Sequence, residues 1–215
     1  MTLCHLGTRA LTTITAVSIG GFVLLAAAYE RDPLAAVDRE TAEWVAASMP
    51  SWADWLARPP SWLGGWIGVT ALALVFCVVL VRERAWLDLA FFLTAVAGSQ
   101  IVVALLKAWF DRPRPHLGSV IALPSSAAFP SGHATAVVAS LGAGAVLVAE
   151  RIPSQRARVW LWTFVVIGGL AAGVSRVVLD VHYVTDVIAG WCLGLAWLAA
   201  GLLARERIQG QREEV

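Results

Sequence analysis

The sequence predicts an all-α, polytopic membrane protein with six transmembrane helices. Of the 215 residues, 59% are hydrophobic and only 14% are charged, whereas charged residues make up about 25% of a typical soluble domain. Apolar stretches of about 20 residues, the length that spans a hydrocarbon core as a helix, recur along the whole chain. Because lipid offers no hydrogen-bond partners to backbone amides, each stretch is expected to be helical.

The six predicted spans occupy most of the chain, so we expect a single membrane-embedded domain over residues 1–215. The fourth span is the shortest and is rich in alanine and glycine, which is typical of a helix packed against other helices. The spans are residues 11–29, 62–81, 87–106, 132–149, 159–179 and 184–204.

Residues 30–61, between the first two spans, contain several acidic residues together with Trp44, Trp52 and Trp55. Indole rings favour the headgroup level of a bilayer, so this segment is predicted to form an amphipathic helix lying in the interface. Two roles remain open for it: a lid over a site, or a plain aromatic anchor.

Arginine placement predicts the orientation of the chain. Nine arginines fall on the side that carries both termini: Arg9, Arg82, Arg84, Arg151, Arg156, Arg158, Arg205, Arg207 and Arg212. The opposite side has seven basic residues, of which three are needed for the site proposed below. Since cytoplasmic loops carry the excess of positive charge, both termini are predicted to be cytoplasmic in a plasma membrane.

Composition also limits the partners. The formal net charge is +1, and no run of basic residues forms a stripe that could follow a nucleic-acid backbone. Membrane lipids are the expected surroundings, and neither nucleic acid nor an obligate protein partner is predicted. The three cysteines, Cys4, Cys77 and Cys192, have no metal-ligand spacing. Cys77 and Cys192 lie inside apolar runs and are expected to be small buried hydrophobic residues.

Charged and titratable residues gather in three segments at the ends of spans, at residues 107–115, 129–133 and 175–186. Spans three and five end, and spans four and six begin, on the same side of the membrane. Helix parity therefore places all three segments on the face opposite the termini, which is the extracytoplasmic face in the predicted orientation. Charged groups at the ends of membrane spans are energetically costly, so a cluster of them is interpreted as a candidate functional site.

The chemistry of these segments suits a phosphate group. Lys107, Arg114 and Arg176 supply three cations, and the arginine fork matches phosphate oxygens. Ser131 and Gly132 stand where a helix begins, and free backbone amides at a helix start bind anions.

Three titratable residues complete a reaction scheme. His182 and Asp186 are four residues apart on one helix face, so the carboxylate can hold one ring nitrogen and leave the other as a nucleophile. His133 is then the general acid for the leaving oxygen and the base for the hydrolytic water. Asp111, Arg112 and His116 are expected in the connecting loop, in solvated or structural roles.

These residues resemble the three signature motifs of the type 2 phosphatidic acid phosphatase family. The first reads Lys107, six residues, Arg114-Pro115; the second is Pro130-Ser131-Gly132-His133; the third is Ser175-Arg176, five residues, His182, three residues, Asp186. The motifs lie within residues 107–186. Two positions depart from the pattern: Val184 stands where proline is common, and Asp180 where glycine often occurs.

The resemblance implies a phosphohistidine intermediate on His182, formed without a metal or other cofactor, with His133 protonating and Asp186 orienting. It also implies that the phosphate is held by Lys107, Arg114, Ser131, Gly132, Ser175 and Arg176. The expected substrate is a lipid phosphate or diphosphate. An isoprenoid carrier diphosphate such as undecaprenyl diphosphate is favoured over phosphatidic acid or phosphatidylglycerophosphate, because the chain is small and has no added headgroup-binding domain.

Three other uses of the same residues stay open at this point. His116, His133, His182 and Asp186 could gather around zinc, although nearby cations would repel it. The chain could be a lipid transporter without catalysis, although the charges crowd at one interface rather than at the midplane. It could also pass the phosphoryl group to another lipid instead of to water.

Overall fold

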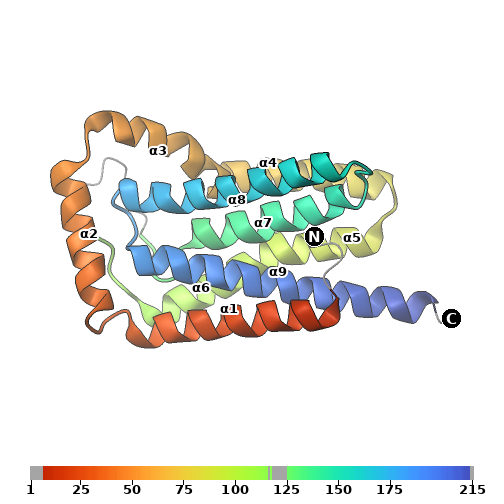
Figure 1. The fold of residues 1–215 in the computed structure, drawn as a ribbon, viewed down its shortest axis with the longest axis horizontal. Helices are drawn as coiled ribbons and strands as arrows, with labels where there is room; N and C mark the ends of the chain where they lie inside the picture. Colours follow the sequence, from red (N-terminus) through yellow and green to blue (C-terminus); the bar gives the residue numbers. More distant parts are fainter. Residues whose placement is uncertain (1–6, 116, 118–124, 214–215) are drawn as a thin grey trace.

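The computed structural model describes residues 7–115, 117 and 125–213, and this part of the chain is helical with no β-strand. Figure 1 shows long helices running side by side, with one helix crossing their ends. The elements are α1 (Thr8–Ala28), α2 (Leu34–Ser48), α3 (Ser51–Gly64), α4 (Trp66–Arg82), α5 (Trp86–Leu93), the π-helical turn η2 (Thr94–Gly98), α6 (Ser99–Phe110), α7 (Gly132–Ala149), α8 (Gln155–Val178) and α9 (Val184–Glu213).

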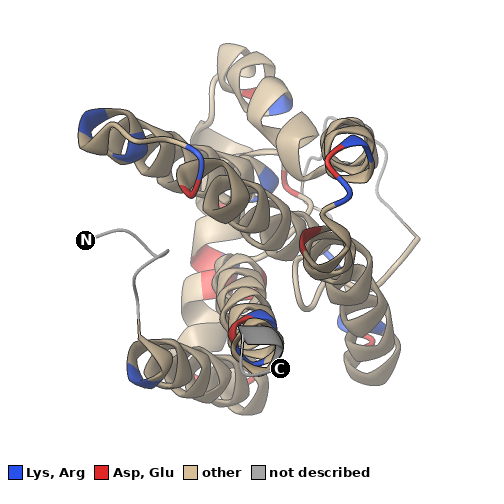
Figure 2. Ribbon diagram, turned by 90° about the vertical axis from the view of Figure 1, so that its right-hand side faces the viewer, with Lys and Arg blue, Asp and Glu red and all other residues tan. Residues whose placement is uncertain are grey.

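Six helical stretches among the described residues are long and apolar enough to cross a membrane, as the sequence predicts. They are Thr8–Ala28, Ser51–Arg82, Trp86–Phe110, Gly132–Ala149, Gln155–Val178 and Val184–Gln211. Large apolar side chains such as Leu74, Val75 and Val78 are more than half exposed, which is stable where the solvent is lipid. Lysine, arginine, aspartate and glutamate lie mostly toward helix ends (Figure 2). The chain is therefore a multi-pass membrane protein.

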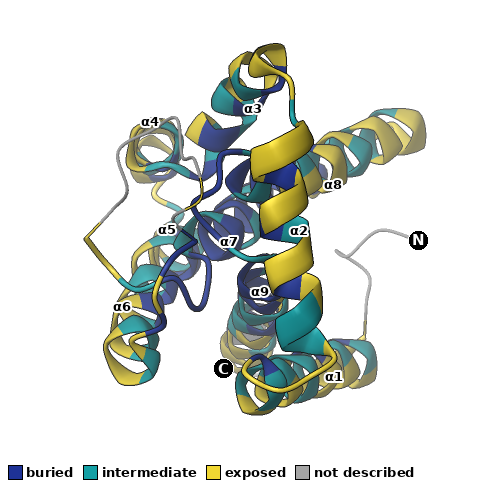
Figure 3. Cartoon of the chain, turned by 90° about the vertical axis from the view of Figure 1, so that its left-hand side faces the viewer, coloured by how far each residue is buried: buried dark blue, intermediate teal, exposed yellow. Residues whose placement is uncertain are grey.

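Helix α7 is the centre of the bundle. In its window of 18 residues, 72% of positions are buried, against 11% for α1, and Figure 3 shows it enclosed by the other helices. Its small residues permit this, because a Cβ on Gly142 would lie 2.4 Å from Leu198 Cδ2, and one on Gly190 of α9 would lie 2.6 Å from Ser131 O. The prediction that residues 132–149 pack against other helices is confirmed.

The segment between the first two spans differs from the single helix expected for residues 30–61. It forms two helices, α2 and α3, and α3 continues through Gly65 into α4. The buried side of α3 consists of Ala53, Ala57, Ser61 and Gly64, and it packs against α8 and α7. Because these small residues carry little hydrophobic signal, and Pro59-Pro60 reads as a break, α3 was not distinguishable from an interfacial helix by pattern alone.

Helix α2 lies across the end of the bundle at which α6 and α8 finish and α7 and α9 start (Figures 1 and 3). It is shorter than the spans, with 15 residues, and buries Asp38, Ala42 and Val45. Trp44 on the same helix is 56% exposed. Helix α2 therefore covers the end of the bundle that carries the charged segments.

Candidate active site

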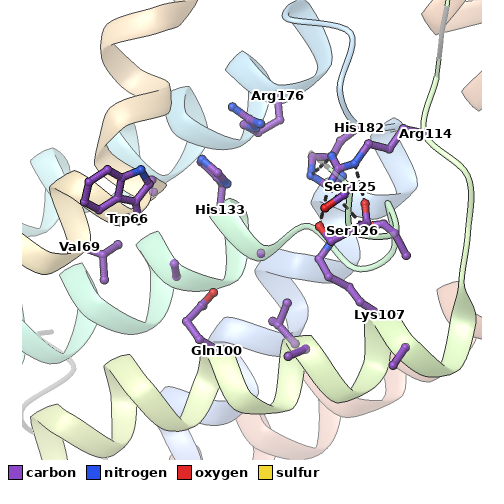
Figure 4. A pocket seen from close by; sticks show the side chains of 18 of the residues that line it. Trp66, Val69, Gln100, Lys107, Arg114, Ser125, Ser126, His133, Arg176 and His182 are labelled. Carbon is purple, nitrogen blue, oxygen red and sulfur yellow. Dashed lines mark hydrogen bonds between the residues drawn. The ribbon is translucent and has the colours of Figure 1, made fainter. Parts of the chain in front are cut away.

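The three charged segments meet at one end of the bundle, as helix parity predicts. Two backbone hydrogen bonds join them: Ala128 N–H donates to Arg112 O at 2.7 Å, and Ser131 N–H donates to Asp186 O at 2.9 Å. The loop after α6, the start of α7 and the start of α9 are thus held together. Their side chains face a common space (Figure 4).

The turn between α8 and α9 presents His182. The backbone N–H groups of Val181 and His182 both donate to Arg176 O, at 3.1 and 3.2 Å. Asp180 has a left-handed backbone with φ 53°, which glycine adopts freely and aspartate tolerates better than most residues. This conformation explains why glycine suits the position, and Asp180 preserves the turn while its Oδ2 accepts a hydrogen bond from Leu117 N–H at 3.0 Å.

His182 is buried and is held by Asp186. The ring atom Nδ1 lies 3.3 Å from Asp186 Oδ2, and the same oxygen accepts a hydrogen bond from Tyr183 N–H at 2.9 Å. Both side chains are almost completely shielded from solvent. The pairing expected from four-residue spacing on a helix is present.

The partners of His182 determine which ring nitrogen carries the proton. Nε2 lies 3.1 Å from Arg114 Nη1, and a guanidinium can only donate, so Nε2 accepts and the proton is on Nδ1, facing Asp186. Burial lowers the pKa of His182 to about 4, although Asp186 opposes this shift. The imidazole is therefore neutral at neutral pH, and its Nε2 lone pair is directed at Arg114.

Two of the predicted phosphate-binding cations are held by the loop before α7. Lys107 Nζ donates to Ala127 O and, at 3.4 Å, to Ala128 O. Arg114 donates from Nε to Ser126 O at 2.9 Å and from Nη1 to Val181 O at 2.7 Å. Both cations thus already donate hydrogen bonds to backbone carbonyl oxygens.

Arg176 and His133 lie on the side of the site away from this loop (Figure 4). Arg176 Nη1 donates to Ser61 Oγ at 2.5 Å, while its buried Nε has no hydrogen-bond partner among the described residues. The end of α3 packs on the first turn of α7, since a Cβ on Gly64 would lie 2.6 Å from His133 O. Helix α3 therefore fixes the position of His133 and the direction of Arg176.

The small residues of the motifs divide into two groups. Gly132 lines the cavity, where a Cβ would come within 3.4 Å of Val103 and 3.9 Å of Lys107. Ser131 caps α7 by accepting a hydrogen bond from Ala134 N–H, and Ser175 donates to Ala172 O at 2.7 Å. The two serine hydroxyls therefore form hydrogen bonds with the backbone of their own helices, and neither serine is part of the cavity wall.

A cavity of about 770 Å³ lies between α3, α4, α6 and α7 and reaches the motif residues. One end is polar and is lined by Lys107, Arg114, Ser126, His133, Arg176 and His182. The rest of the wall includes the apolar residues Trp66, Val69, Val103, Ala104 and Ala136, together with Thr70 and Gln100. The cavity can therefore take an amphiphile with an anionic head and an apolar tail.

Arg112 and Asp38 belong to the site although sequence reasoning did not place them there. Arg112 Nη1 lies 2.6 Å from Asp186 Oδ1, and Nη2 lies 2.8 Å from Asp38 Oδ2 on α2. Thr185 joins the network, since its N–H donates to Asp38 Oδ1 at 3.1 Å and its hydroxyl accepts from Arg112 at 2.8 Å. Asp186 is thereby held by Arg112 through one carboxylate oxygen while the other faces His182.

The guanidinium of Arg112 is also clamped between two rings, 4.5 Å from the centroid of Tyr29 and 4.3 Å from that of Tyr183. Burial acts against its charge, but Asp186 and Asp38 outweigh that effect and raise the pKa of Arg112. Arg112 therefore has a structural role in the loop, as expected, and that role is to hold Asp186 and Asp38. The repeated Arg-Pro of residues 112–115 was the only sequence signal for it, and Asp38 had none.

The metal alternative finds no ligand set in the described part of the chain. Over residues 7–115, 117 and 125–213, no three side chains among histidine, cysteine, aspartate and glutamate are grouped to hold an ion. His116, which that alternative includes, lies outside the described residues. The described groups that surround the cavity end are chiefly cations.

Comparisons with known proteins agree with the motifs. Residues 88–209 match the family model of the PAP2 superfamily. Phosphatidylglycerophosphatase B of Bacillus subtilis is 26% identical over 178 residues, which are 81% of this chain and 86% of that protein. Undecaprenyl-diphosphatase of Sulfolobus acidocaldarius is 35% identical over 140 residues, which are 62% of this chain and 60% of that protein.

A solved structure shares the fold. It is the crystal structure of a transmembrane PAP2 type phosphatidylglycerolphosphate phosphatase from Bacillus subtilis, with a TM-score of 0.83, 23% identity, and coverage of 90% of this chain and 96% of that one. The family model spans more than half of the chain, and its match includes all three motif segments. The chain belongs to the PAP2 superfamily of membrane lipid phosphatases.

Proposed function

We propose that this protein hydrolyses a lipid phosphate or diphosphate through a phosphohistidine intermediate on His182. The observation that carries the proposal is the position of His182: its Nδ1 is paired with Asp186, its Nε2 accepts from Arg114, and the ring lies in the wall of a cavity that is also lined by Lys107, Arg114 and Arg176. When Arg114 binds the phosphate, Nε2 is released for attack. A nucleophile surrounded by fixed cations suits phosphoryl transfer, where positioning and charge stabilisation supply most of the catalysis.

In the first step, Nε2 of His182 forms a bond to phosphorus as the bond to the leaving oxygen breaks. His133 gives its proton to that oxygen, while Asp186 stabilises the positive charge that develops on the His182 ring. In the second step, water attacks the phosphohistidine and His133 takes a proton from the water. Inorganic phosphate then leaves and His182 is neutral again.

The cations act on the three oxygens of the transferring group. Lys107 and Arg114 exchange the carbonyls of residues 126–128 for phosphate oxygens, and Arg176 offers its Nε, which has no partner within the described structure. The start of α7 at Gly132 adds backbone amides. Ser131 and Ser175 contribute by holding helix ends in place, since their hydroxyls are engaged within the helices.

The favoured substrate is an isoprenoid carrier diphosphate such as undecaprenyl diphosphate. It is supported by the resemblance to the Sulfolobus undecaprenyl-diphosphatase at 35% identity and by the apolar residues of the cavity wall, among them Trp66, Val69 and Val103. Phosphatidylglycerophosphate is the alternative. It is supported by the longer match to the Bacillus phosphatidylglycerophosphatase, over 81% of this chain.

We further propose that the whole chain acts as one domain, without a metal, in a plasma membrane with both termini in the cytoplasm and the site on the opposite face. The excess of arginine on the side of the termini supports this orientation. Helix α2 then lies at the outer interface, with Trp44 exposed on it. Full activity in excess chelator would agree with the metal-free mechanism, and restoration of a lost activity by zinc would contradict it.

The test is to trap the intermediate with lipid substrate labelled in the terminal phosphate. The wild type is expected to form an acid-labile, base-stable phosphoenzyme, and His182→Ala is expected to form none and to release no phosphate. His133→Ala is the matched control, because it retains the nucleophile: it should still become labelled, but much more slowly than the wild type, so labelling is followed over a long incubation. Substantial turnover by His182→Ala would show that the nucleophile is another group. A protein that binds lipid phosphates but releases no phosphate would be a transporter or binding protein, and a labelled lipid product would indicate phosphotransfer.

A further inference from the structure

A smaller cavity of about 370 Å³ adjoins the first on the side of His133. Its wall includes Arg58, Ser61, Trp62 and Leu179, and it shares Gly65, Trp66 and His133 with the larger cavity. A volume in this range is sufficient for a small ligand group. The shared residues make it an extension of the active site rather than a separate site.

Arg58 is the cation of this second cavity. Its guanidinium stacks on Trp55 at 4.8 Å from the ring centroid, and its buried Nε has no hydrogen-bond partner in the described part of the chain. No aspartate or glutamate is among the described residues of the cavity wall. A buried, unsatisfied donor costs free energy, so an acceptor is expected to fill its place in the working complex.

The position of Arg58 relative to the two histidines indicates which acceptor this is. In-line attack by His182 directs the leaving group away from His182, toward the acid His133. Figure 4 shows these two histidines on either side of the space below Arg176. The second cavity begins at His133, and Ser61 on its wall is already bonded to Arg176. A group that binds at Arg58 therefore belongs to the leaving side of the substrate.

Resting on the function proposed above, we propose that Arg58 binds a second phosphate of the substrate, located in the leaving group. In an isoprenoid diphosphate this is the phosphate that stays on the lipid, and in phosphatidylglycerophosphate it is the phosphodiester. Arg58 is thus a specificity-determining residue that favours substrates with two phosphates over simple monophosphates. Its stacking on Trp55 restricts the orientation of the planar fork.

The experiment compares Arg58→Gln with the wild type on two matched pairs of lipids. One pair is a farnesyl diphosphate and farnesyl monophosphate, and the other is phosphatidylglycerophosphate and phosphatidic acid with the same acyl chains. Loss of a charged hydrogen bond is expected to lower kcat/KM for the two-phosphate member by about 10- to 100-fold and for the monophosphate by less than about 3-fold. The pair that shows the selective loss identifies the source of the second phosphate.

Two variants serve as controls. Arg58→Lys keeps the charge without the fork and should show an intermediate loss. Arg39→Gln on α2, whose side chain is 62% exposed and pairs with Asp32 at 3.8 Å, should leave both members of each pair unchanged. An equal loss in both members would make Arg58 a general structural or lipid-anchoring residue, and no loss in either would remove it from the substrate site.

A binding measurement separates this proposal from the function it rests on. By calorimetry with detergent-purified protein, inorganic pyrophosphate should bind the wild type more tightly than inorganic phosphate, and Arg58→Gln should abolish the difference. Absence of the phosphoenzyme with this difference present would refute the phosphatase mechanism and leave the second anion site standing. Equal affinity of the wild type for the two anions would overturn the second anion site.

Discussion

Arg112 holds Asp186 at 2.6 Å on the carboxylate oxygen that does not face His182. The same guanidinium is fixed by Asp38 of α2 at 2.8 Å, and the three side chains are each at most 9% exposed. The orientation of the His182 imidazole, the proposed nucleophile, therefore depends on a helix that precedes the motif residues by about 70 positions. Asp38 and Arg112 are positioning residues, because neither is among the residues of the main cavity wall.

Asp38→Asn is expected to lower kcat by about 10-fold with little change in KM, since it removes about 1.5 kcal/mol of support for the orientation of Asp186 rather than a substrate contact. The measurement is steady-state kinetics combined with the rate of phosphoenzyme formation. Asp32→Asn, at the exposed end of α2, is the control and should be neutral. In an Asp186→Asn background the Asp38 substitution should have little additional effect, and full additivity would disprove the connection.

His133→Ala should affect substrates according to their leaving group. Its proton is needed for a poor leaving group such as a lipid alcohol, whereas p-nitrophenolate leaves without assistance, so the rate of phosphorylation should fall about 100-fold or more for the first and much less for the second. Single-turnover measurements on both substrates test this. Equal losses would assign His133 to binding or structure.

The acid limb of the rate profile should reflect the burial of His182. Because burial lowers the pKa of His182 to about 4, the neutral nucleophile persists as the pH falls from 7 to about 5, and phosphorylation by p-nitrophenyl phosphate should decline only near pH 4. If the nucleophile had the ordinary histidine pKa of about 6.5, the phosphorylation rate would fall to half its maximum near pH 6.5. The lowered pKa also affects the free energy of unfolding. Below about pH 6.5 the unfolded chain binds a proton at His182 and the folded chain does not, so the free energy of unfolding falls as the pH is lowered from about 6.5 to 4. A histidine stabilised by a salt bridge would have the opposite effect. A midpoint near 6.5 in the phosphorylation rate would contradict this assignment.

Gly190→Ala should loosen the contact of α9 with α7. The added Cβ would lie 2.6 Å from Ser131 O and 2.9 Å from Ala134 Cβ, so the helices must separate and the free energy of unfolding should fall by about 1 to 3 kcal/mol. Thermal unfolding in detergent measures the loss, and activity should fall with it, since Ser131 and Asp186 are joined across this contact. Gly168→Ala is the matched control, because its nearest neighbour would be 3.7 Å away, and it should be neutral or stabilising.

Hydropathy and helix parity were sufficient for the spans and for the meeting of the three motifs, because both depend on local composition and on the side of the membrane at which a helix ends. The small residues of α7 likewise predicted its central place. The packing of helix α3 inside the bundle was not predicted, since its buried face of Ala53, Ala57, Ser61 and Gly64 consists of small residues, and its contacts with α8 and α7 are made only in the fold.

The residues of the motifs could be chosen from sequence because their types and spacing match the chemistry of phosphoryl transfer. The residues that hold them could not. Asp38 is an ordinary acidic residue on an amphipathic helix until the fold brings it to Arg112, 74 positions away. Arg58 is likewise one of several arginines near an interface, and only the cavity beside His133 distinguishes it.

In the proposed mechanism, the carbonyl oxygens of residues 126–128 accept, in the absence of substrate, the hydrogen bonds that Lys107 and Arg114 would otherwise donate to phosphate oxygens. Lys107 and Arg114 already donate to Ser126 and Ala127 oxygens, so an arriving phosphate gains only the difference between two sets of hydrogen bonds. The same exchange runs in reverse after hydrolysis, when the loop can reclaim both cations. In the proposed mechanism, this exchange favours the release of inorganic phosphate from a strongly positive site, so that tight binding of the product does not limit turnover.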